Sequence, residues 1–384
     1  MIRFGRPMRR RFLLQPGTAF LNHGSFGATP RSVLAAAARW QRRIEANPDR
    51  FMRRVLPRAL RGAAARLAHF LNCGGNDLVF VENATAGVNA VLRSLRLRRG
   101  DEVLATTHTY NAVRQALRHA CGLAGAKLVE APIALPVASE GDLVGPIREN
   151  ISGRTRLVVL DHIASPTGLI FPVRRLARLA RAGGAQVLVD GAHAPGQVAL
   201  DLPSLGADWY VGNCHKWLFA PKGCGFLWAR RGAQQDLHPT VISHFYREGF
   251  TREFDWVGTR DFSAWLSVPE ALAFYREMSK AGLRRYNHVL AADAGRRMSE
   301  AWGEPLDGPA ALHGSMIAVR LPKRLQHQDP ARLMHRWLER ERTVVAVTAV
   351  GGALWARISA QVYNAPEDYD RLSRIWAGRA RARR

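Results

Sequence analysis

Short apolar runs alternate with amphipathic stretches from about residue 76 to residue 229. The runs predict strands at 78–81, 102–105, 127–130, 157–160, 186–189, 209–211 and 225–228. Between them, apolar residues recur every three or four positions, which predicts helices at 85–97, 110–121, 143–151 and 173–182. Repeated strand–helix units imply an α/β fold with a mostly parallel sheet covered by helices. Ligands of such sheets bind at the carboxyl ends of the strands, so polar residues that follow an apolar run are candidates for a site.

The pattern changes after about residue 262. Long helices are expected at 264–278 and 283–301, and short strands at 315–320, 343–347 and 355–359 then alternate with a helix at 331–340. This second pattern indicates a smaller α/β domain. We therefore divide the chain into an N-terminal arm (1–20), a large domain (21–262) and a small C-terminal domain (263–384).

Composition adds little to this picture and excludes some partners. The 384 residues suit one large domain and one smaller one, and no window approaches the ~20 apolar residues of a membrane span. The formal net charge of +25 is compatible with nucleic-acid binding. However, the arginines are scattered and do not form one patch, so we expect neither a nucleic-acid nor a membrane partner. The four cysteines contain no CxxC pair, which favours a reducing, cytoplasmic setting and gives no reason to expect a metal.

Lysine is rare in this chain, so each lysine is informative. Lys216 follows the predicted strand at 209–211, inside a run of small and aromatic residues. A lysine buried at a strand end is costly unless its charge is used or lost. Desolvation lowers the pKa of such an amine and makes it a nucleophile for a carbonyl compound. The alternative is an ordinary surface lysine in a loop.

Two further segments have matching chemistry. Asp190 ends a strand that should be buried on both faces, where an unpaired charge is expensive. A protonated pyridine nitrogen, as in pyridoxal 5′-phosphate (PLP), is one suitable partner, and a capping aspartate is the plain alternative. Thr85 lies where a strand turns into a helix, and the helix N–H groups, the helix dipole and the Thr85 hydroxyl together suit a phosphate. Thr85 also fits a simple N-cap. No GxGxxG or GxxxxGK[ST] motif occurs, which argues against a dinucleotide or P-loop site.

The order of these features, a phosphate cradle, an aromatic ring, an acid and then a lysine, resembles the class V aminotransferase family of fold-type I PLP enzymes. Within that family the chain is most similar to isopenicillin N epimerase-like proteins. The stretches that support the resemblance span nearly the whole chain and lie at 20–27, 161–168, 190–193, 213–217, 258–261 and 357–359. The resemblance implies a PLP enzyme whose large domain binds the cofactor.

The resemblance also implies three catalytic residues. Lys216 would hold the cofactor as a Schiff base and later move protons at the substrate Cα. Asp190 would pair with the pyridinium nitrogen. His193 would lie beside the ring, where it contacts the cofactor O3′ or orients Asp190.

The same resemblance implies the residues that hold the cofactor phosphate. Thr85 and the Ala86 N–H would bind it, and Asn213 and His215 would line the same side. Thr259 would reach the phosphate of the neighbouring subunit, which requires a homodimer with shared active sites.

Other implied contacts concern the cofactor ring. Tyr110 would stack on the ring face, although His108 is close enough to be the true stacking residue. Ser165 stands where many relatives carry an O3′-binding asparagine, and Asp161 belongs to the same cofactor-binding segment.

The substrate would be a small amino-acid-type molecule. Arg357 would bind its α-carboxylate with a bidentate fork, and Asn22 and His23 would close the pocket. For His23, His108 and His162 the alternative is a hydrogen-bonded histidine of the core or of a loop.

The motifs leave the reaction open, because PLP weakens any of three bonds at Cα and the protein selects one by orientation. Our first expectation is epimerisation or racemisation of an amino acid or peptide-like substrate, with Lys216 as one base and a tyrosine, histidine or water as the second. The alternatives are β-elimination from a cysteine derivative, as in C–S lyases, and transamination or oxidative deamination. A cysteine desulfurase needs a mobile-loop cysteine, which neither Cys214 nor Cys224 resembles. A non-catalytic regulator or nucleic-acid binder on a PLP fold is a further alternative, which the intact lysine motif argues against.

Overall fold

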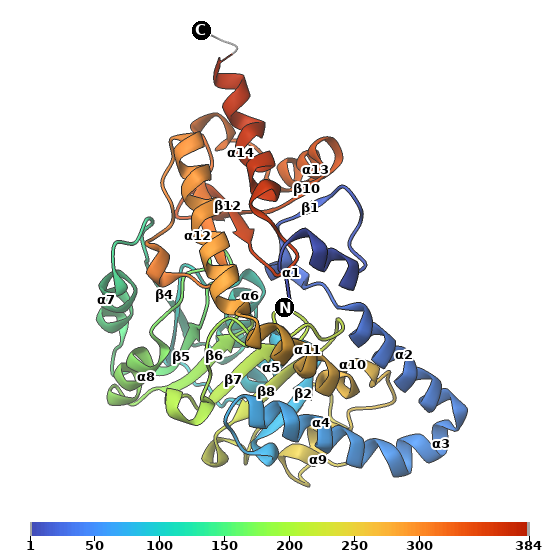
Figure 1. The fold of residues 1–384 in the computed structure, drawn as a ribbon. Helices are drawn as coiled ribbons and strands as arrows, with labels where there is room; N and C mark the ends of the chain where they lie inside the picture. Colours follow the sequence, from blue (N-terminus) through green and yellow to red (C-terminus); the bar gives the residue numbers. More distant parts are fainter. Residues whose placement is uncertain (1, 382–384) are drawn as a thin grey trace.

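The computed structural model describes the backbone of residues 2–381 and the side chains of residues 2–374. A seven-stranded sheet forms the centre of the large domain (Figure 1), in the order β2-β8-β7-β6-β5-β3-β4. All neighbours are parallel except those of β8, which is antiparallel to both β2 and β7. The mostly parallel sheet predicted from the sequence is therefore confirmed. The strand bounds are β2 Leu78–Val81, β3 Glu102–Thr106, β4 Lys127–Ala131, β5 Thr155–Asp161, β6 Gln186–Gly191, β7 Trp209–Asn213 and β8 Gly225–Ala229.

The strands are apolar on both faces because both faces are covered. Val79, Val159 and Val211 point into one core cluster with helices α5 and α6. Leu78 and Val158, on the other face, join a second core cluster. This cluster holds side chains of α7 and α8, of α4 (Leu56–Phe70) and of α11 (Val268–Lys280). This alternation of faces explains why the strands read as continuous apolar runs. The helices of the large sheet are α5 Ala84–Ser94, α6 Asn111–Ala124, α7 Glu140–Asn150 and α8 Val173–Ala182.

The segment before β2 is helical, although no element was predicted there. Its main helices are α2 Arg31–Ala46 and α4 Leu56–Phe70, joined by the short α3 Pro48–Arg50 and a π-helical turn at Phe51–Val55. They extend beside the sheet (Figure 1) and pack against α10 Ser263–Leu266 and α11 Val268–Lys280. The single helix predicted at 264–278 is thus two helices, with Pro269 in the first turn of α11.

The small domain contains a three-stranded antiparallel sheet in the order β11-β12-β9 with its own core cluster. The predicted strand at 343–347 is split, because β10 pairs in parallel with β1 of the N-terminal arm while β11 pairs with β12. The α11 side chains join the large-domain core. The small-domain core cluster contains Ala19 and Leu21 together with residues from Leu290 of α12 onwards. The domain boundary at 262/263 stays a prediction. The bounds are β1 Ala19–Phe20, α12 Leu283–Trp302, β9 Met316–Arg320, α13 Pro330–Glu341, β10 Thr343–Val344, β11 Ala346–Val350, β12 Ala353–Ser359 and α14 Pro366–Arg381.

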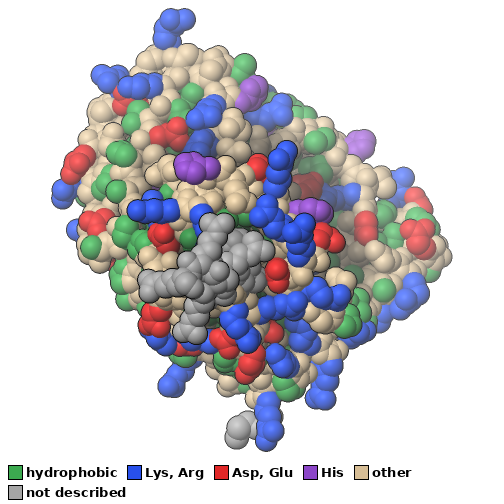
Figure 2. Space-filling view, turned by 90° about the horizontal axis from the view of Figure 1, so that it is seen from above, with side chains coloured by type: hydrophobic (Ala, Val, Ile, Leu, Met, Phe, Trp, Pro, Cys, Tyr) green, Lys and Arg blue, Asp and Glu red, His purple; other side chains and the backbone are tan. Residues whose placement is uncertain are grey.

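The positive charge is visible on the face at the small-domain side. Figure 2 shows many Lys and Arg side chains there, some of them adjoining one another, with Asp and Glu side chains among them. Among the described residues, no helix combines the length and the apolar character needed to cross a membrane.

Candidate active site

A cavity of about 400 Å³ opens where the strands β5, β6 and β7 end. Its position is the one expected for a parallel sheet. Most of the polar residues that follow the predicted strands meet here, although they are far apart in the sequence. The residues that line the cavity are Ser25, Phe26, Asn83, Ala84, Thr85, Tyr110, Asp161, Ile163, Ser165, Asp190, Ala192, His193, Asn213, His215 and Lys216.

Two buried carboxyl groups lie side by side at the floor of this cavity. Asp161 and Asp190 are direct partners in the register of β5 and β6. Oδ1 of Asp190 accepts a hydrogen bond from the Ala192 amide at 2.9 Å, whereas Oδ2 of Asp161 is buried without a partner among the described residues. Burial raises the pKa of Asp161 well above its usual value, and the neighbouring Asp190 raises it further. Burial also raises the pKa of Asp190, but its Ala192 hydrogen bond and the nearby Lys216 oppose the shift. Asp190 is therefore the member of the pair that is better able to carry a charge.

Lys216 lies on the loop after β7 and points into the same cavity. Its Nζ is 3.2 Å from Nε2 of His193, which is fully buried. Burial, with the positive charge of Arg357, lowers the pKa of Lys216 to about 7, although Asp190 opposes the shift. A large share of this lysine is then an unprotonated amine near neutral pH, which is the form that attacks a carbonyl group.

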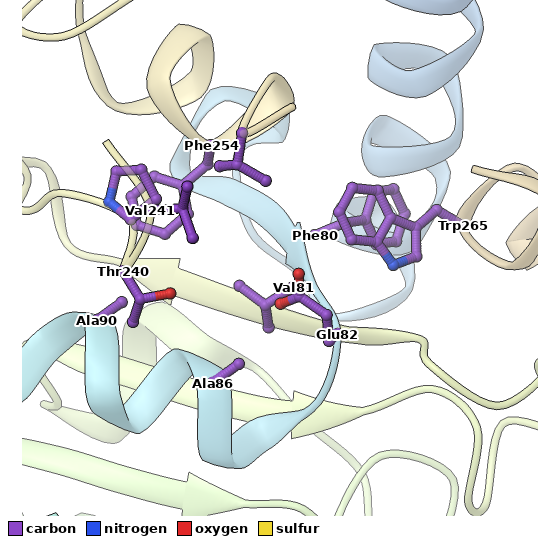
Figure 3. A pocket seen from close by; sticks show the side chains of 11 residues that line it. Phe80, Val81, Glu82, Ala86, Ala90, Thr240, Val241, Phe254 and Trp265 are labelled. Carbon is purple, nitrogen blue, oxygen red and sulfur yellow. The ribbon is translucent and has the colours of Figure 1, made fainter. Parts of the chain in front are cut away.

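The start of α5 forms another wall of the cavity. The side chain of Asn83 caps the helix, because its Oδ1 accepts from the Ala86 amide at 2.9 Å, and Oδ1 of Asn213 accepts from the Ala84 amide at 2.9 Å. The Ala86 amide, expected at the phosphate, is thus already engaged. Ala86 instead faces a separate cavity of about 30 Å³ behind the helix (Figure 3). Thr85 faces the larger cavity, as do Asn83 and Ala84 of the same turn. His215 lines this cavity too, and its Nδ1 donates to the Cys224 carbonyl at 2.9 Å.

The two candidates for ring stacking occupy different environments. Tyr110 lines the cavity and is half exposed. His108 is fully buried, with Nε2 3.2 Å from the Ile133 carbonyl and its ring edge-on to Phe171. Of these two candidates, Tyr110 is the one that lines the cavity.

Arg357, on β12 of the small domain, does not line the cavity itself but contacts Ser165 and Ser25, which do. One of its terminal nitrogens donates to the Ser165 carbonyl, and the other donates to Asn22 Oδ1 at 3.0 Å and Ser25 Oγ at 3.1 Å. The side chain is buried, its Nε has no partner, and no described carboxylate forms an ion pair with it. A buried cation of this kind needs an anion, and the cavity edge at Ser25 and Ser165 is where one fits.

Two histidines of the sequence motifs belong to the core. His23 does not line the cavity. Its Nε2 donates to the Lys216 carbonyl at 3.0 Å and its Nδ1 lies 2.8 Å from the Tyr363 hydroxyl. His23 thus stabilises the backbone of the loop that carries Lys216. His162 is hydrogen-bonded to Tyr210 at 2.9 Å. For both residues the structure therefore agrees with the alternative stated above, a hydrogen-bonded histidine of the core.

Thr259 lies outside the Lys216 cavity and lines a larger groove of about 1110 Å³ together with residues of α3 and α4. The next residue, Arg260, forms an ion pair with Glu82 and lies 4.2 Å from the centre of the Trp265 ring. Figure 3 shows Glu82 and Trp265, with Phe80 stacked against the indole. These contacts hold the Thr259 loop next to the beginning of α5.

Sequence reasoning missed several lining residues. Phe26 and Ile163 lie within motif stretches, but an apolar residue at a cavity wall gives no signal of its own. Ala192 and Asn83 adjoin predicted site residues. Asn83 also precedes a predicted helix, so its role as the N-cap could have been predicted from the sequence. Among the described residues, no group of three or more potential metal ligands was found.

Comparison with known proteins agrees with this geometry. A family model described as aminotransferase class-V matches residues 20–372. The chain is 34% identical over 394 residues to an L-cysteine desulfhydrase from Arabidopsis thaliana, covering 93% of this chain and 87% of the relative. It is 35% identical over 388 residues to isopenicillin N epimerase from Streptomyces clavuligerus, covering 95% of this chain and 96% of the relative.

Solved structures share the fold at low sequence identity. A cysteine desulfurase from Thermococcus onnurineus NA1 superposes with a TM-score of 0.83 at 19% identity, over 100% of this chain and 99% of that one. A C-DES mutant with glycine covalently linked to its PLP cofactor superposes with a TM-score of 0.81 at 21% identity, over 96% and 98% of the two chains. These likenesses concern the fold alone.

Proposed function

This chain belongs to the class V aminotransferase family and is an enzyme whose cofactor is PLP, and we propose that it cleaves the carbon–sulfur bond of L-cysteine by β-elimination. The proposal rests mainly on the size of the cavity. Its volume of about 400 Å³ is near the lower end of the ~300–1,000 Å³ typical of ligand pockets, and it must hold both cofactor and substrate. A small amino acid fits this space better than a peptide-like molecule.

The residues present fit the cofactor. A ligand that matches the cavity needs three groups. These are a cationic ring nitrogen for the buried Asp190, a carbonyl group for the Lys216 amine and an anionic group for the start of α5 at Thr85. PLP carries all three, and Tyr110 offers an aromatic face for its ring. When bound, PLP withdraws electrons from the Cα of an attached amino acid.

The remaining chemistry belongs to side chains of this protein. Arg357 binds the substrate α-carboxylate and thereby fixes the orientation of the bonds at Cα. Lys216 Nζ removes the Cα proton, because its lowered pKa keeps it unprotonated. The resulting ammonium then returns this proton to the departing sulfur. One base on one side of the substrate is enough for this sequence, and His193 keeps Nζ in place at 3.2 Å.

The positions of the cysteines argue that the sulfur is released as free sulfide. A persulfide product on the enzyme needs a reactive thiol at the site, and no cysteine lines the cavity. Cys121, Cys214 and Cys224 are buried and Cys73 is half-buried elsewhere. All four are free thiols, which also supports our proposal of a cytoplasmic setting.

The reaction is tested by incubating the purified enzyme with L-cysteine and with a panel of other amino acids in D₂O. We expect sulfide, pyruvate and ammonia in equal amounts from L-cysteine. Recovery of Cα-deuterated amino acid with inverted configuration and no pyruvate overturns the proposal in favour of an epimerase. A keto acid formed together with a pyridoxamine cofactor overturns it in favour of transamination.

Epimerisation is the second candidate, because Tyr110 brings another ionisable hydroxyl to the cavity. It would serve as the second base that inversion requires, opposite Lys216. In this case Tyr110→Phe stops inversion while exchange of the Cα proton by Lys216 continues. Loss of both exchange and inversion in this variant would argue against two separate bases.

Replacing Arg357 by lysine is expected to raise KM for the amino acid by about tenfold or more, with kcat much less affected. The ammonium keeps the charge but cannot form the two parallel hydrogen bonds of a guanidinium fork. Steady-state kinetics provide the measurement. Arg320→Lys on the neighbouring strand β9 is the control and should leave KM unchanged. An unchanged KM in Arg357→Lys removes this residue from the site.

A homodimer with shared sites is also proposed, because Thr259 lines a groove other than the cavity of its own Lys216. Lys216→Ala and Thr259→Ala are each expected to be impaired, the second through weaker cofactor binding. In a mixed dimer, the Lys216 of the Thr259→Ala chain meets the intact Thr259 of the other chain, so one site is complete. Mixing the variants at limiting PLP should therefore restore activity. Absence of recovery, in mixed dimers confirmed by mass spectrometry, contradicts the sharing of sites.

A further inference from the structure

Trp217, the neighbour of Lys216, contacts the cavity indirectly. Its side chain is buried and its indole Nε1 lies 3.4 Å from Nδ1 of His193. The other nitrogen of the same imidazole, Nε2, lies 3.2 Å from Lys216 Nζ. His193 therefore stands between an indole and the lysine amine, with one ring nitrogen directed at each.

The indole restricts which nitrogen of His193 carries the proton. An indole N–H is a donor and never an acceptor, so Nδ1 of His193 must be the acceptor of this contact. A neutral imidazole then has its only proton on Nε2, and Nε2–H donates towards Lys216. This hydrogen bond requires a lone pair on Nζ, which only the neutral amine possesses.

The surroundings of His193 favour its neutral form. Burial lowers its pKa well below the usual value, and the positive charges of Lys216 and Arg357 and the nearby His215 and His23 lower it further. Asp190 is the acidic group that faces Lys216 and favours its ammonium form. The state of the amine thus depends on these charges and on the proton position in His193.

We propose that Trp217 is a positioning residue that holds His193 in its Nε2–H form and so favours the neutral, reactive amine of Lys216. This inference rests on the proposed role of Lys216 and deepens it. Without the indole N–H, the proton of His193 is free to move to Nδ1. Nε2 then becomes an acceptor and stabilises the Lys216 ammonium.

Trp217 also packs tightly, which a test must separate from the hydrogen bond. Its ring centre lies 4.9 Å from that of His23, and a side chain at Gly196 would meet the Trp217 carbonyl at 2.5 Å. Trp217→Phe keeps an aromatic ring and removes the N–H. Trp209→Phe is the matched control, because it removes a buried indole N–H that donates to the Ala233 carbonyl at 3.0 Å, at the start of β7 and away from Lys216.

The first measurement needs no substitution of Trp217. Nitrogen-15 NMR of the histidine-labelled, PLP-free protein distinguishes protonated from unprotonated ring nitrogens, and the His193 signals are assigned by their loss in His193→Gln. We expect the proton on Nε2. A proton on Nδ1 overturns the proposal, even if Trp217→Phe fails to fold.

The second measurement is the pH dependence of PLP uptake by the PLP-free protein, followed by the appearance of the bound yellow cofactor. Uptake by the native protein should have its midpoint near pH 7, where Lys216 loses its proton. In Trp217→Phe the midpoint should rise by about one pH unit, so uptake well below the midpoint is about tenfold slower. An unmoved midpoint, equal to that of Trp209→Phe, assigns Trp217 a packing role only and overturns the proposal. Neither measurement depends on which reaction the enzyme catalyses. A failure of this inference can therefore be distinguished from a failure of the proposed function.

Discussion

Replacing Lys216 by alanine is expected to abolish turnover, with kcat falling by at least about a thousandfold. This amine has two roles in our account, as the group that holds the cofactor and as the base at Cα. The amine lies after the end of β7 and near Asp190, and its pKa of about 7 suits both roles. No other lysine lines the cavity, so no neighbouring side chain is placed to substitute for it. Steady-state kinetics with saturating PLP provide the measurement.

The control for this variant is Lys127→Ala, which changes an exposed lysine at the start of β4. It should keep native kinetics. If Lys216→Ala retains kcat within tenfold of the native value, while its far-ultraviolet circular dichroism is native, then the amine is neither the carrier nor the base.

Asp190→Asn is expected to lower kcat by roughly a hundredfold, because breaking a buried charge pair costs about 3 kcal/mol. Asparagine has the shape of aspartate and can still accept from the Ala192 amide, but it cannot stabilise a protonated ring nitrogen. The cofactor should still bind covalently to Lys216, so the loss appears in turnover and not in PLP content.

Asp161→Asn is the informative comparison for that variant. Burial and the adjacent Asp190 raise the pKa of Asp161, which favours the neutral form of this carboxyl. An amide replaces a neutral carboxyl with less disturbance, and we expect a much smaller loss of kcat. The reverse order of the two losses would mean that Asp161 carries the charge and that the ring nitrogen faces β5.

The alternation of strands and helices between β2 and β8 was readable from the sequence because both faces of the sheet are buried. The strands then lack polar positions and stand out from amphipathic helices. Helix ends were less accurate where a side chain defines them. Helix α7 starts at Glu140, before the predicted 143, because Ser139 and Asp142 form a capping box. The split of the predicted strand at 343–347 depends on pairing with β1, a contact between opposite ends of the chain that no local pattern reveals.

The site was predictable as far as strand ends determine it. Asp161, Asp190 and Asn213 end adjacent parallel strands, so their proximity follows from the sheet. Tyr110 and His108 are two residues apart in a loop, where no periodicity determines which side chain enters the cavity. The contact of Trp217 with His193 likewise depends on how the loop after β7 folds back over the end of β6, which the sequence does not specify.

The central claim is that the Lys216 amine holds the cofactor, and borohydride reduction of the PLP-loaded enzyme tests it most directly. Reduction makes the cofactor–lysine linkage permanent, and peptide mapping by mass spectrometry then locates the label. We expect one cofactor per chain, attached to residue 216, with the nearby Lys222 unlabelled. A label on any other lysine, or a yellow protein that carries no label after reduction, contradicts the account.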